Sequence, residues 1–273
     1  MMVQTSMPSL REFGIAFLWG TEWKPAQNEF GALPFVYGTV VSSLLALLMA
    51  VPISLGIAIF LVEQAPAKVA RPIAFMVELL AAIPSVVYGL WGIFVLAPFI
   101  RNYLGWFLQE YFGWIPLFQG RLTGIGMLTG GIILALMITP IITAVVRDVL
   151  EAVPTTQREA ALALGATKWE TTTIVLGNAA SGIAGAIVLG LGRAIGETMA
   201  VTMVIGNSPQ ISASLFEPAN TIASLLAANF AEATDELYLS ALIEIGVVLF
   251  LVTFVVNAFA KLLIMGVGRG AKT

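Results

Sequence analysis

The feature that most constrains this chain is a series of long stretches without a charged side chain. Residues 33–62 contain no Asp, Glu, Lys or Arg, and a helix of about 20 apolar residues is enough to cross the hydrocarbon core of a bilayer. Only 11% of the 273 residues are charged, whereas soluble domains average about 25%. The sequence therefore predicts an all-α fold, a polytopic bundle of transmembrane helices in a lipid bilayer.

Five apolar stretches are long enough to span the membrane. They predict helices at Phe35–Leu61, Pro72–Ile100, Leu122–Val146, Ser181–Gly206 and Tyr238–Met265. Residues 101–121 are rich in Tyr, Trp and Phe, whose rings favour the headgroup region, so we expect an interfacial loop there. The expected organisation is an N-terminal segment (1–34), a transmembrane domain (35–265) and a C-terminal tail (266–273).

Lys and Arg are distributed unequally between the two predicted sides of the membrane. One side holds eight, namely Lys68, Arg71, Arg147, Arg158, Lys168, Lys261, Arg269 and Lys272, and the other holds four, namely Arg11, Lys24, Arg101 and Arg121. Because basic residues favour the cytoplasmic side, we expect the loop 147–173 and the tail 266–273 to be cytoplasmic and the segment 1–34 to be extracytoplasmic. Five spans with an external N-terminus also lead us to expect a further helix upstream of this sequence.

The absence of certain residue types excludes several classes of catalytic and metal-binding site. The chain has no Cys and no His, which removes thiolate nucleophiles, histidine bases and Cys/His zinc sites. Its net charge is −3, so no overall basic field favours nucleic acid. The phosphate-binding pattern G-x-x-x-x-G-K-[ST] does not occur, which excludes ATP hydrolysis by that route. We expect no enzyme, no catalytic residue, no metal and no cofactor bound by this chain, and no nucleic-acid partner.

The longest predicted cytoplasmic loop contains two helix-start signals. Thr156 and Glu159 have the spacing of a capping box, which predicts a helix from the next residue after the threonine. Gly165 is suited to the left-handed conformation that ends a helix. Thr167 and Glu170 repeat the capping-box spacing, which predicts a second helix that continues directly into the fourth span.

The first of these two helices has two interpretations. Its small surface of Ala160, Ala161, Ala163 and Leu164 is suited to the groove of a partner protein. Alternatively, it is an ordinary amphipathic helix that rests on the bilayer.

The same loop resembles a known family. Glu159-Ala160-Ala161, followed after three residues by Gly165, is similar to the EAA motif of binding-protein-dependent ABC importer permeases. The resemblance implies a type I ABC importer permease fold, with these four residues coupling the chain to a cytoplasmic ATPase. Gly177–Asn178 stands where the family motif has Leu-Pro.

Three longer segments, residues 30–66, 78–92 and 189–207, resemble the PstC family of phosphate-transport permeases, which usually have six spans. The resemblance implies an ATP-driven importer of inorganic phosphate in the bacterial cytoplasmic (inner) membrane. It also implies three kinds of partner: a cytoplasmic ATPase dimer that holds the ATP, a second permease subunit of the PstA type, and an extracytoplasmic phosphate-binding protein.

Arg193 lies in the middle of the fourth predicted span, where an unpaired arginine costs about 2.5 to 3.5 kcal/mol on insertion scales. Glu197 follows one helical turn later, so the two side chains are suited to a structural intrahelical pair. Alternatively, they line a translocation path, and this role is the one that the resemblance implies. Ser85 and Thr139 stand next to prolines within spans and are further candidates for the path.

Another class of function uses the same residues. A gradient-driven anion carrier or channel would bind its ion through Arg193 and Glu197, but the internal repeat typical of such carriers is not visible in the sequence. Glu78 and Glu244 lie near span ends, where we expect both carboxylates to reach the membrane interface.

Overall fold

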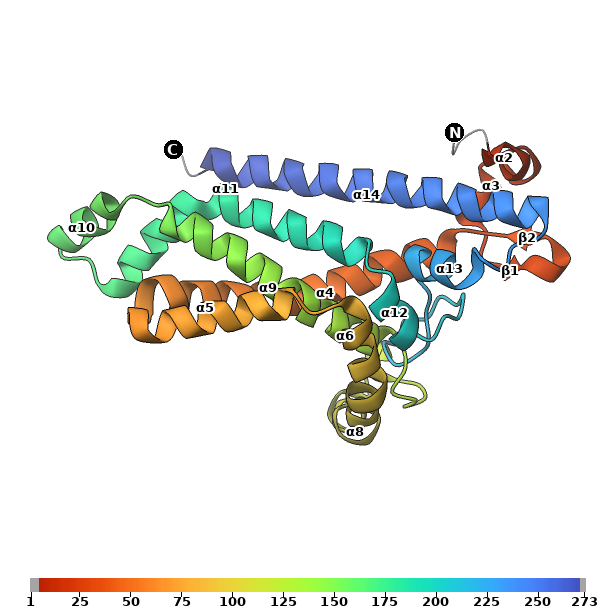
Figure 1. Ribbon diagram of the computed structural model, residues 1–273, viewed down its shortest axis with the longest axis horizontal. Coiled ribbons are helices and arrows are strands. Elements are labelled where there is room, and N and C mark those ends of the chain that lie inside the picture. Colours follow the sequence, from red (N-terminus) through yellow and green to blue (C-terminus); the bar gives the residue numbers. More distant parts are fainter. Residues whose placement is uncertain (1–4, 271–273) are drawn as a thin grey trace. The chain divides into compact units, whose positions relative to one another are not determined.

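The computed structural model describes residues 5–270, with side chains described as far as Leu262, and its architecture is helical (Figure 1). The helices are α2 (Met7–Phe13), α3 (Ala16–Trp19), α4 (Leu33–Ile59), α5 (Ala67–Ala81), α6 (Ser85–Trp91), α7 (Ala97–Phe99), α8 (Gly105–Phe112), α9 (Met127–Glu151), α10 (Thr155–Ala163), α11 (Lys168–Ile195), α12 (Met199–Val204), α13 (Ile222–Asn229) and α14 (Glu236–Gly270). Strands β1 (Trp23–Lys24) and β2 (Glu29–Phe30) pair in antiparallel fashion. Short 3₁₀ turns occupy Pro25–Gln27 and Pro116–Phe118, and π-helical turns occupy Phe60–Gln64, Gly92–Leu96 and Ile100–Leu104.

Among the described residues, five helices are long and apolar enough to cross a membrane. They are Leu33–Gln64, Ser85–Phe112, Met127–Glu151, Lys168–Ile195 and Glu236–Leu262. Helices suit this environment because all their backbone hydrogen bonds are made within the segment, and lipid offers no replacement. The predicted all-α polytopic fold is confirmed, and so is the number of spans within the described part of the chain.

The predicted second span, Pro72–Ile100, is wrong. Helix α5 ends at Ala81, and α6 begins at Ser85 after a break at Pro84, because proline disfavours helical backbone in the residue before it. The spanning helix then continues through two π-helical turns to Phe112. The predicted interfacial loop at 101–121 is therefore helical over its first half.

The predicted fourth span, Ser181–Gly206, is also displaced. Helix α11 begins earlier, at Lys168, and ends at Ile195. The threonine hydroxyls of its first turns bond back to carbonyls four residues earlier, as Thr172 does to Lys168 at 3.0 Å, so a polar sequence is accommodated within the helix. After a break, α12 begins at Met199.

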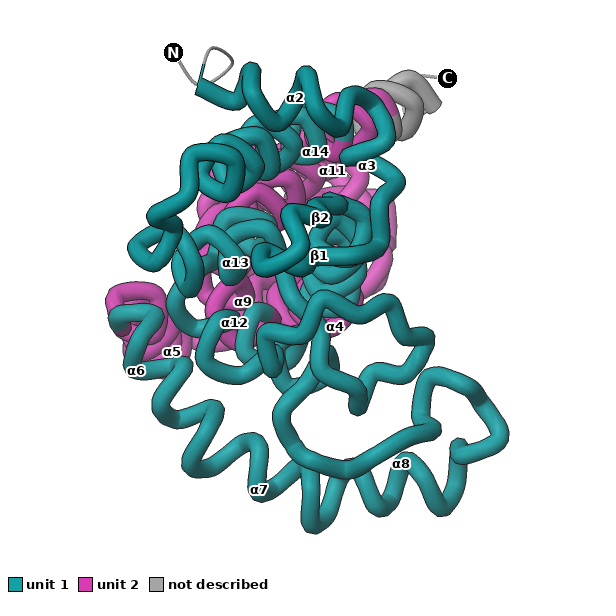
Figure 2. The backbone as a smooth tube through the Cα atoms, turned by 90° about the vertical axis from the view of Figure 1, so that its right-hand side faces the viewer, with its two compact units in different colours: residues 1–46, 84–134, 194–255 teal, residues 47–83, 135–193, 256–273 magenta. Residues whose placement is uncertain are grey.

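The chain folds as two compact units, coloured separately in Figure 2. The first comprises residues 1–46, 84–134 and 194–255, and the second comprises residues 47–83, 135–193 and 256–273. Four long helices, α4, α9, α11 and α14, contribute residues to both units.

The core of the first unit gathers the N-terminal segment around aromatic side chains. The Trp23 ring lies 5.0 Å from the rings of Phe30 and Phe35, and Phe30 stacks on Tyr238 of α14 at 5.7 Å. Such pairs add to the stabilisation from burial. The predicted N-terminal segment 1–34 is thus packed, in its described part, onto the start of α4 and of α14.

A polar contact also holds α2 to α14 in the first unit. The Ser9 backbone N–H donates to Ser240 Oγ at 3.0 Å, and the Ser9 hydroxyl donates to the Glu244 carboxylate. Glu244 is only 5% exposed. The expectation that this carboxylate reaches the interface is wrong, because Ser9 is placed over it.

In the second unit, α11 packs closely on α9. A Cβ atom added at Gly182 would lie 2.5 Å from Val149 Cγ1, and one at Gly190 would lie 2.6 Å from Ile142 Cδ1. Small residues therefore let the two helices approach each other, as is common in membrane bundles. Ser54 Oγ of α4 donates to the backbone carbonyl of Thr139 in α9 at 3.1 Å. This packing positions α10, which joins α9 to α11 (Figure 1).

Candidate coupling surface and substrate path

Helix α10 begins at Thr155, directly after Pro154. The Gln157 N–H donates to the Pro154 carbonyl at 3.1 Å, and no side chain caps this end. The predicted capping box of Thr156 and Glu159 is therefore wrong, because the helix starts two residues before the position that this box requires.

The turn after α10 has the left-handed glycine and the second capping box that the sequence predicts. Gly165 has a φ of +85°, and a Cβ atom added there would meet nothing within 4 Å. The glycine is thus required by its backbone conformation and not by lack of space. The Thr167 N–H donates to Glu170 Oε2 at 2.7 Å, and the Glu170 N–H donates to Thr167 Oγ1 at 3.3 Å. This capping box starts α11 at Lys168, which confirms the second predicted helix.

The predicted coupling residues differ in exposure. Glu159, Ala160 and Gly165 are exposed, whereas Ala161 is 5% exposed and faces its own chain. Ala161 is thus buried within the chain, and its coupling role stays a prediction.

Large apolar side chains extend this exposed surface. Leu162, Leu164 and Trp169 are 51%, 90% and 64% exposed. Sequence reasoning included Leu164 and missed the other two, although their position beside the motif was a usable signal. Apolar groups gathered in a short polar loop are typical of a docking surface.

Arg158 attaches α10 to two spans. Its Nη2 and Nε donate to Glu63 Oε1 at 2.8 and 3.1 Å, and Glu63 lies in the π-helical turn that follows α4. Its Nη1 donates to the Val153 carbonyl at 2.7 Å, and Nη2 donates to the Leu150 carbonyl at 2.9 Å. The arginine and glutamate side chains are only 20% and 9% exposed.

Asn178 of α11 takes part in a further contact with α10. Its Nδ2 donates to Gln157 Oε1 at 2.8 Å. The asparagine that replaces the family proline therefore connects α10 to α11.

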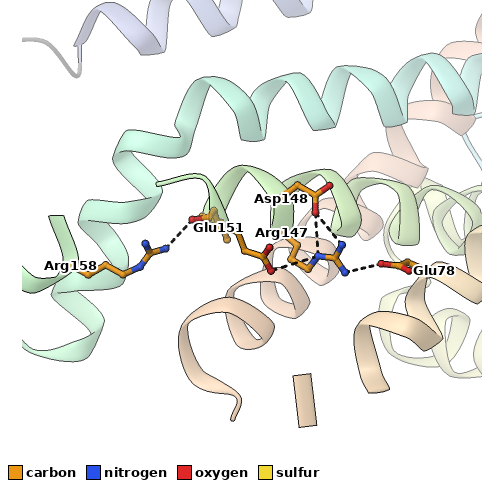
Figure 3. A network of polar contacts seen from close by, with 6 residues as sticks. Glu78, Arg147, Asp148, Glu151 and Arg158 are labelled. Carbon is orange, nitrogen blue, oxygen red and sulfur yellow. Dashed lines mark hydrogen bonds and ion pairs between the residues drawn. The ribbon is translucent and has the colours of Figure 1, made fainter. Parts of the chain in front are cut away.

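A second cluster centres on Arg147 near the end of α9 (Figure 3). Its Nη1 donates to Glu78 Oε1 of α5 at 3.0 Å, and its other nitrogens lie 3.1 Å from Asp148 Oδ1 and 3.9 Å from Glu151 Oε1. The expectation that Glu78 reaches the interface from within a span is wrong, because α5 ends before the span and an arginine pairs with this carboxylate.

Arg193 lies in the last turn of α11 and not at mid-span. A positive charge is favourable there because the C-terminal end of a helix carries partial negative charge. In the second unit, a cavity of about 510 Å³ is lined by Ile141, Val188, Leu189, Gly192, Arg193 and Asn257. Buried Asn257 Oδ1 has no hydrogen-bond partner among the residues whose side chains are described. This cavity thus combines an apolar wall with a guanidinium and an amide, and the amide was missed from the sequence.

The other predicted path residues are not among those that line this cavity. Glu197 follows the end of α11 and is 4% exposed, and Glu197 Oε1 accepts from the Ala200 N–H at 3.4 Å. The predicted single helix through Arg193 and Glu197 is therefore wrong. Ser85 is the half-buried first residue of α6. The Thr139 hydroxyl donates to the Ala135 carbonyl of its own helix at 2.7 Å.

A family model for binding-protein-dependent transport system inner membrane components matches residues 50–269. The chain belongs to this family. It is 50% identical over 261 residues to the phosphate transport system permease protein PstC of Xylella fastidiosa, an alignment that covers 94% of this chain and 80% of that protein. PstC of Pasteurella multocida is 48% identical over 273 residues, which cover 98% of this chain and 85% of that protein. The predicted resemblance to the PstC family is thereby confirmed.

More distant relatives agree with this family membership. The probable phosphate transport system permease protein PstC of Methanocaldococcus jannaschii is 36% identical over 258 residues, covering 92% of this chain and 82% of that protein. An inward-facing structure of the MetNI methionine ABC transporter matches with a TM-score of 0.66 at 18% identity, covering 86% of this chain and 95% of that chain. The predicted type I ABC importer permease fold is confirmed by this similarity. The chain is a multi-pass membrane protein and a permease subunit.

Proposed function

We propose that this PstC-family chain is the permease subunit of an ATP-driven importer that moves inorganic phosphate across the bacterial inner membrane. The observation that carries the proposal is its 50% identity, over 94% of its length, to a protein named as a phosphate transport permease. An alignment that covers 94% of this chain includes its spans. The substrate class and the coupling mechanism are therefore expected to be shared.

ATP is bound and hydrolysed by a separate ATPase dimer that docks on α10. The exposed Glu159 and Ala160, together with Leu164 at 90% exposure, provide the surface for this contact. A rigid helix between two spans converts closure of the ATPase into a change of the membrane segments, which is a two-state equilibrium shifted by nucleotide. This chain itself binds no cofactor.

Arg193 is the proposed phosphate contact. Its planar guanidinium presents donors that match two oxygens of a tetrahedral anion, and it lines a cavity whose other walls are mainly apolar. A conducting site also has to release its ion. Glu197, Ser85 and Thr139 remain predicted path residues.

One chain presents one coupling helix, whereas an ATPase dimer has two lobes. The proposal therefore includes a second permease subunit of the PstA type, and an extracytoplasmic phosphate-binding protein that delivers the anion. A gradient-driven carrier or channel that uses Arg193 and Glu197 is not favoured, because the family to which the chain belongs is that of binding-protein-dependent transport systems.

The test is uptake of radiolabelled phosphate into proteoliposomes that contain this chain, the second permease subunit and the ATPase, with the binding protein on the outside. ATP-dependent uptake of phosphate with no uptake of sulfate is the expected result. Phosphate movement without ATP would support the carrier instead. ATP-dependent uptake of another anion would refute the phosphate assignment and leave the permease assignment in place.

A further inference from the structure

We propose that Arg158 is a positioning residue that makes α10 move together with the ends of α4 and α9. Motion imposed on α10 by the ATPase would then reach two spans through one side chain. This inference rests on the proposed function, since it assumes that an ATPase docks on α10.

The three donor nitrogens of Arg158 divide their hydrogen bonds between two structural elements. Nε and Nη2 bind Glu63 Oε1 beyond α4, at 3.1 and 2.8 Å. Nη2 and Nη1 bind the carbonyls of Leu150 and Val153 at the end of α9, at 2.9 and 2.7 Å. The Leu150 carbonyl also accepts from the Val153 N–H at 3.3 Å, so Arg158 adds a second donor there and a side-chain donor to the Val153 carbonyl just after α9.

Arginine is suited to this arrangement for two reasons. Its guanidinium holds five N–H donors in a rigid plane, so the directions of α4, α9 and α10 are fixed relative to one another. Its charge also neutralises Glu63, whose side chain is 9% exposed, and removing one member of a buried ion pair leaves an uncompensated charge. The contacts of Arg158 therefore restrict relative motion of the three helices, and breaking the Arg158–Glu63 pair while α10 is displaced costs free energy.

Arg147 provides a matched control within the same unit. Its side chain has the same 20% exposure as Arg158, and it too binds a carboxylate on another helix. However, its carboxylate partners Glu78, Asp148 and Glu151 belong to α5 and α9, not to α10. Loss of Arg147 should weaken the packing of this unit without releasing the coupling helix (Figure 3).

The experiment uses the complete complex in proteoliposomes and measures three quantities: ATPase association, ATP hydrolysis, and phosphate transported per ATP hydrolysed. The variants are Arg158→Gln, Glu63→Gln, the double variant, Arg158→Lys and the control Arg147→Gln. Arg158→Lys keeps the charge but lacks the planar set of donors, so it should show a partial loss.

We expect Arg158→Gln and Glu63→Gln to retain ATPase association and hydrolysis. Each should lower phosphate transported per ATP by at least about fivefold, the smaller end of typical coupling between sites. The double variant should lose little more than either single one, because both substitutions remove the same contact. Arg147→Gln should keep the wild-type ratio.

Three results would overturn the inference. The first is a wild-type ratio of phosphate transported per ATP in assembled Arg158→Gln, and the second is an equal loss in Arg147→Gln. The third is failure of both Arg158→Gln and Glu63→Gln to bind the ATPase, which would make the contact a requirement of folding alone. If the wild-type complex shows no ATP-driven phosphate uptake, the proposed function fails and this inference fails with it. A working wild type with unaffected variants refutes only the inference.

Discussion

Gly165 allows a quantitative test of the turn that follows α10. Its φ is +85°, and an added Cβ atom would meet nothing within 4 Å. Alanine at this position therefore incurs no steric clash, and the whole cost is that of a left-handed backbone for an L-residue, about 1–2 kcal/mol. That amount corresponds to a factor of about 5–30 in an equilibrium constant.

This cost should appear as easier local opening of the turn. The Gly165 N–H donates to the Leu162 carbonyl at 3.0 Å, and the Ala166 N–H donates to the Ala161 carbonyl at 3.1 Å. In Gly165→Ala, amide hydrogen exchange measured by mass spectrometry should be about 5–30 times faster for these amides, because their protection reports the opening free energy.

The matched control is Gly177→Ala. Gly177 also has no atom within 4 Å of an added Cβ, but it lies within α11 in ordinary helical conformation. Alanine is favoured over glycine in a helix by about 0.5–1 kcal/mol, so exchange around position 177 should stay equal or become slower. Unchanged exchange at Gly165→Ala, or the same increase in both variants, would refute the argument from backbone conformation.

Three further predictions address the site and the packing. Arg193→Ala should abolish phosphate uptake while the complex assembles normally, and loss of assembly in detergent would indicate a structural role instead. Leu164→Ser should leave the thermal stability of the isolated chain unchanged because the side chain is 90% exposed. It should weaken ATPase binding about tenfold or more, as expected when a leucine is no longer buried at an interface. Equal affinity of the variant and the wild type in a binding titration would contradict docking at Leu164. Gly182→Ala should lower the melting temperature by the equivalent of about 1–3 kcal/mol, since its Cβ would lie 2.5 Å from a branched carbon of Val149, whereas Gly185→Ala meets nothing within 4 Å and should not.

The sequence predicts elements well where the signal is local. Thr167 and Glu170 are three residues apart, and their capping box starts α11 as expected. The spans themselves follow from the lack of charge in long stretches, because the bilayer permits few alternatives for an apolar chain.

Span boundaries were predicted less well because average hydropathy does not detect backbone breaks. The apolar sequence continues through Pro84, yet the helix stops at Ala81 and restarts at Ser85. Similarly, apolar sequence continues after Ile195, where α11 ends. Each error misplaced a charged residue: Glu78 lies outside its predicted span, and Arg193 lies at a helix end and not at mid-span.

Contacts between distant residues could not be predicted from one sequence. Arg158 and Glu63 are 95 positions apart, and neither position carries a local pattern that indicates the other. Such a pair is determined by how α4, α9 and α10 pack, which only the folded chain specifies.

These distant contacts bear on the two interpretations of α10. A helix that merely rests on the bilayer needs no specific bond to the spans, since its apolar face is stabilised by lipid. Instead, α10 is bonded to Glu63 and to the end of α9 through Arg158, and to α11 through Gln157 and Asn178. Meanwhile Leu164 remains 90% exposed. Hydrogen bonds thus hold α10 to the membrane segments while Leu164, directly after its end, stays exposed, and this combination favours a partner docking on α10 over a helix that rests on the bilayer.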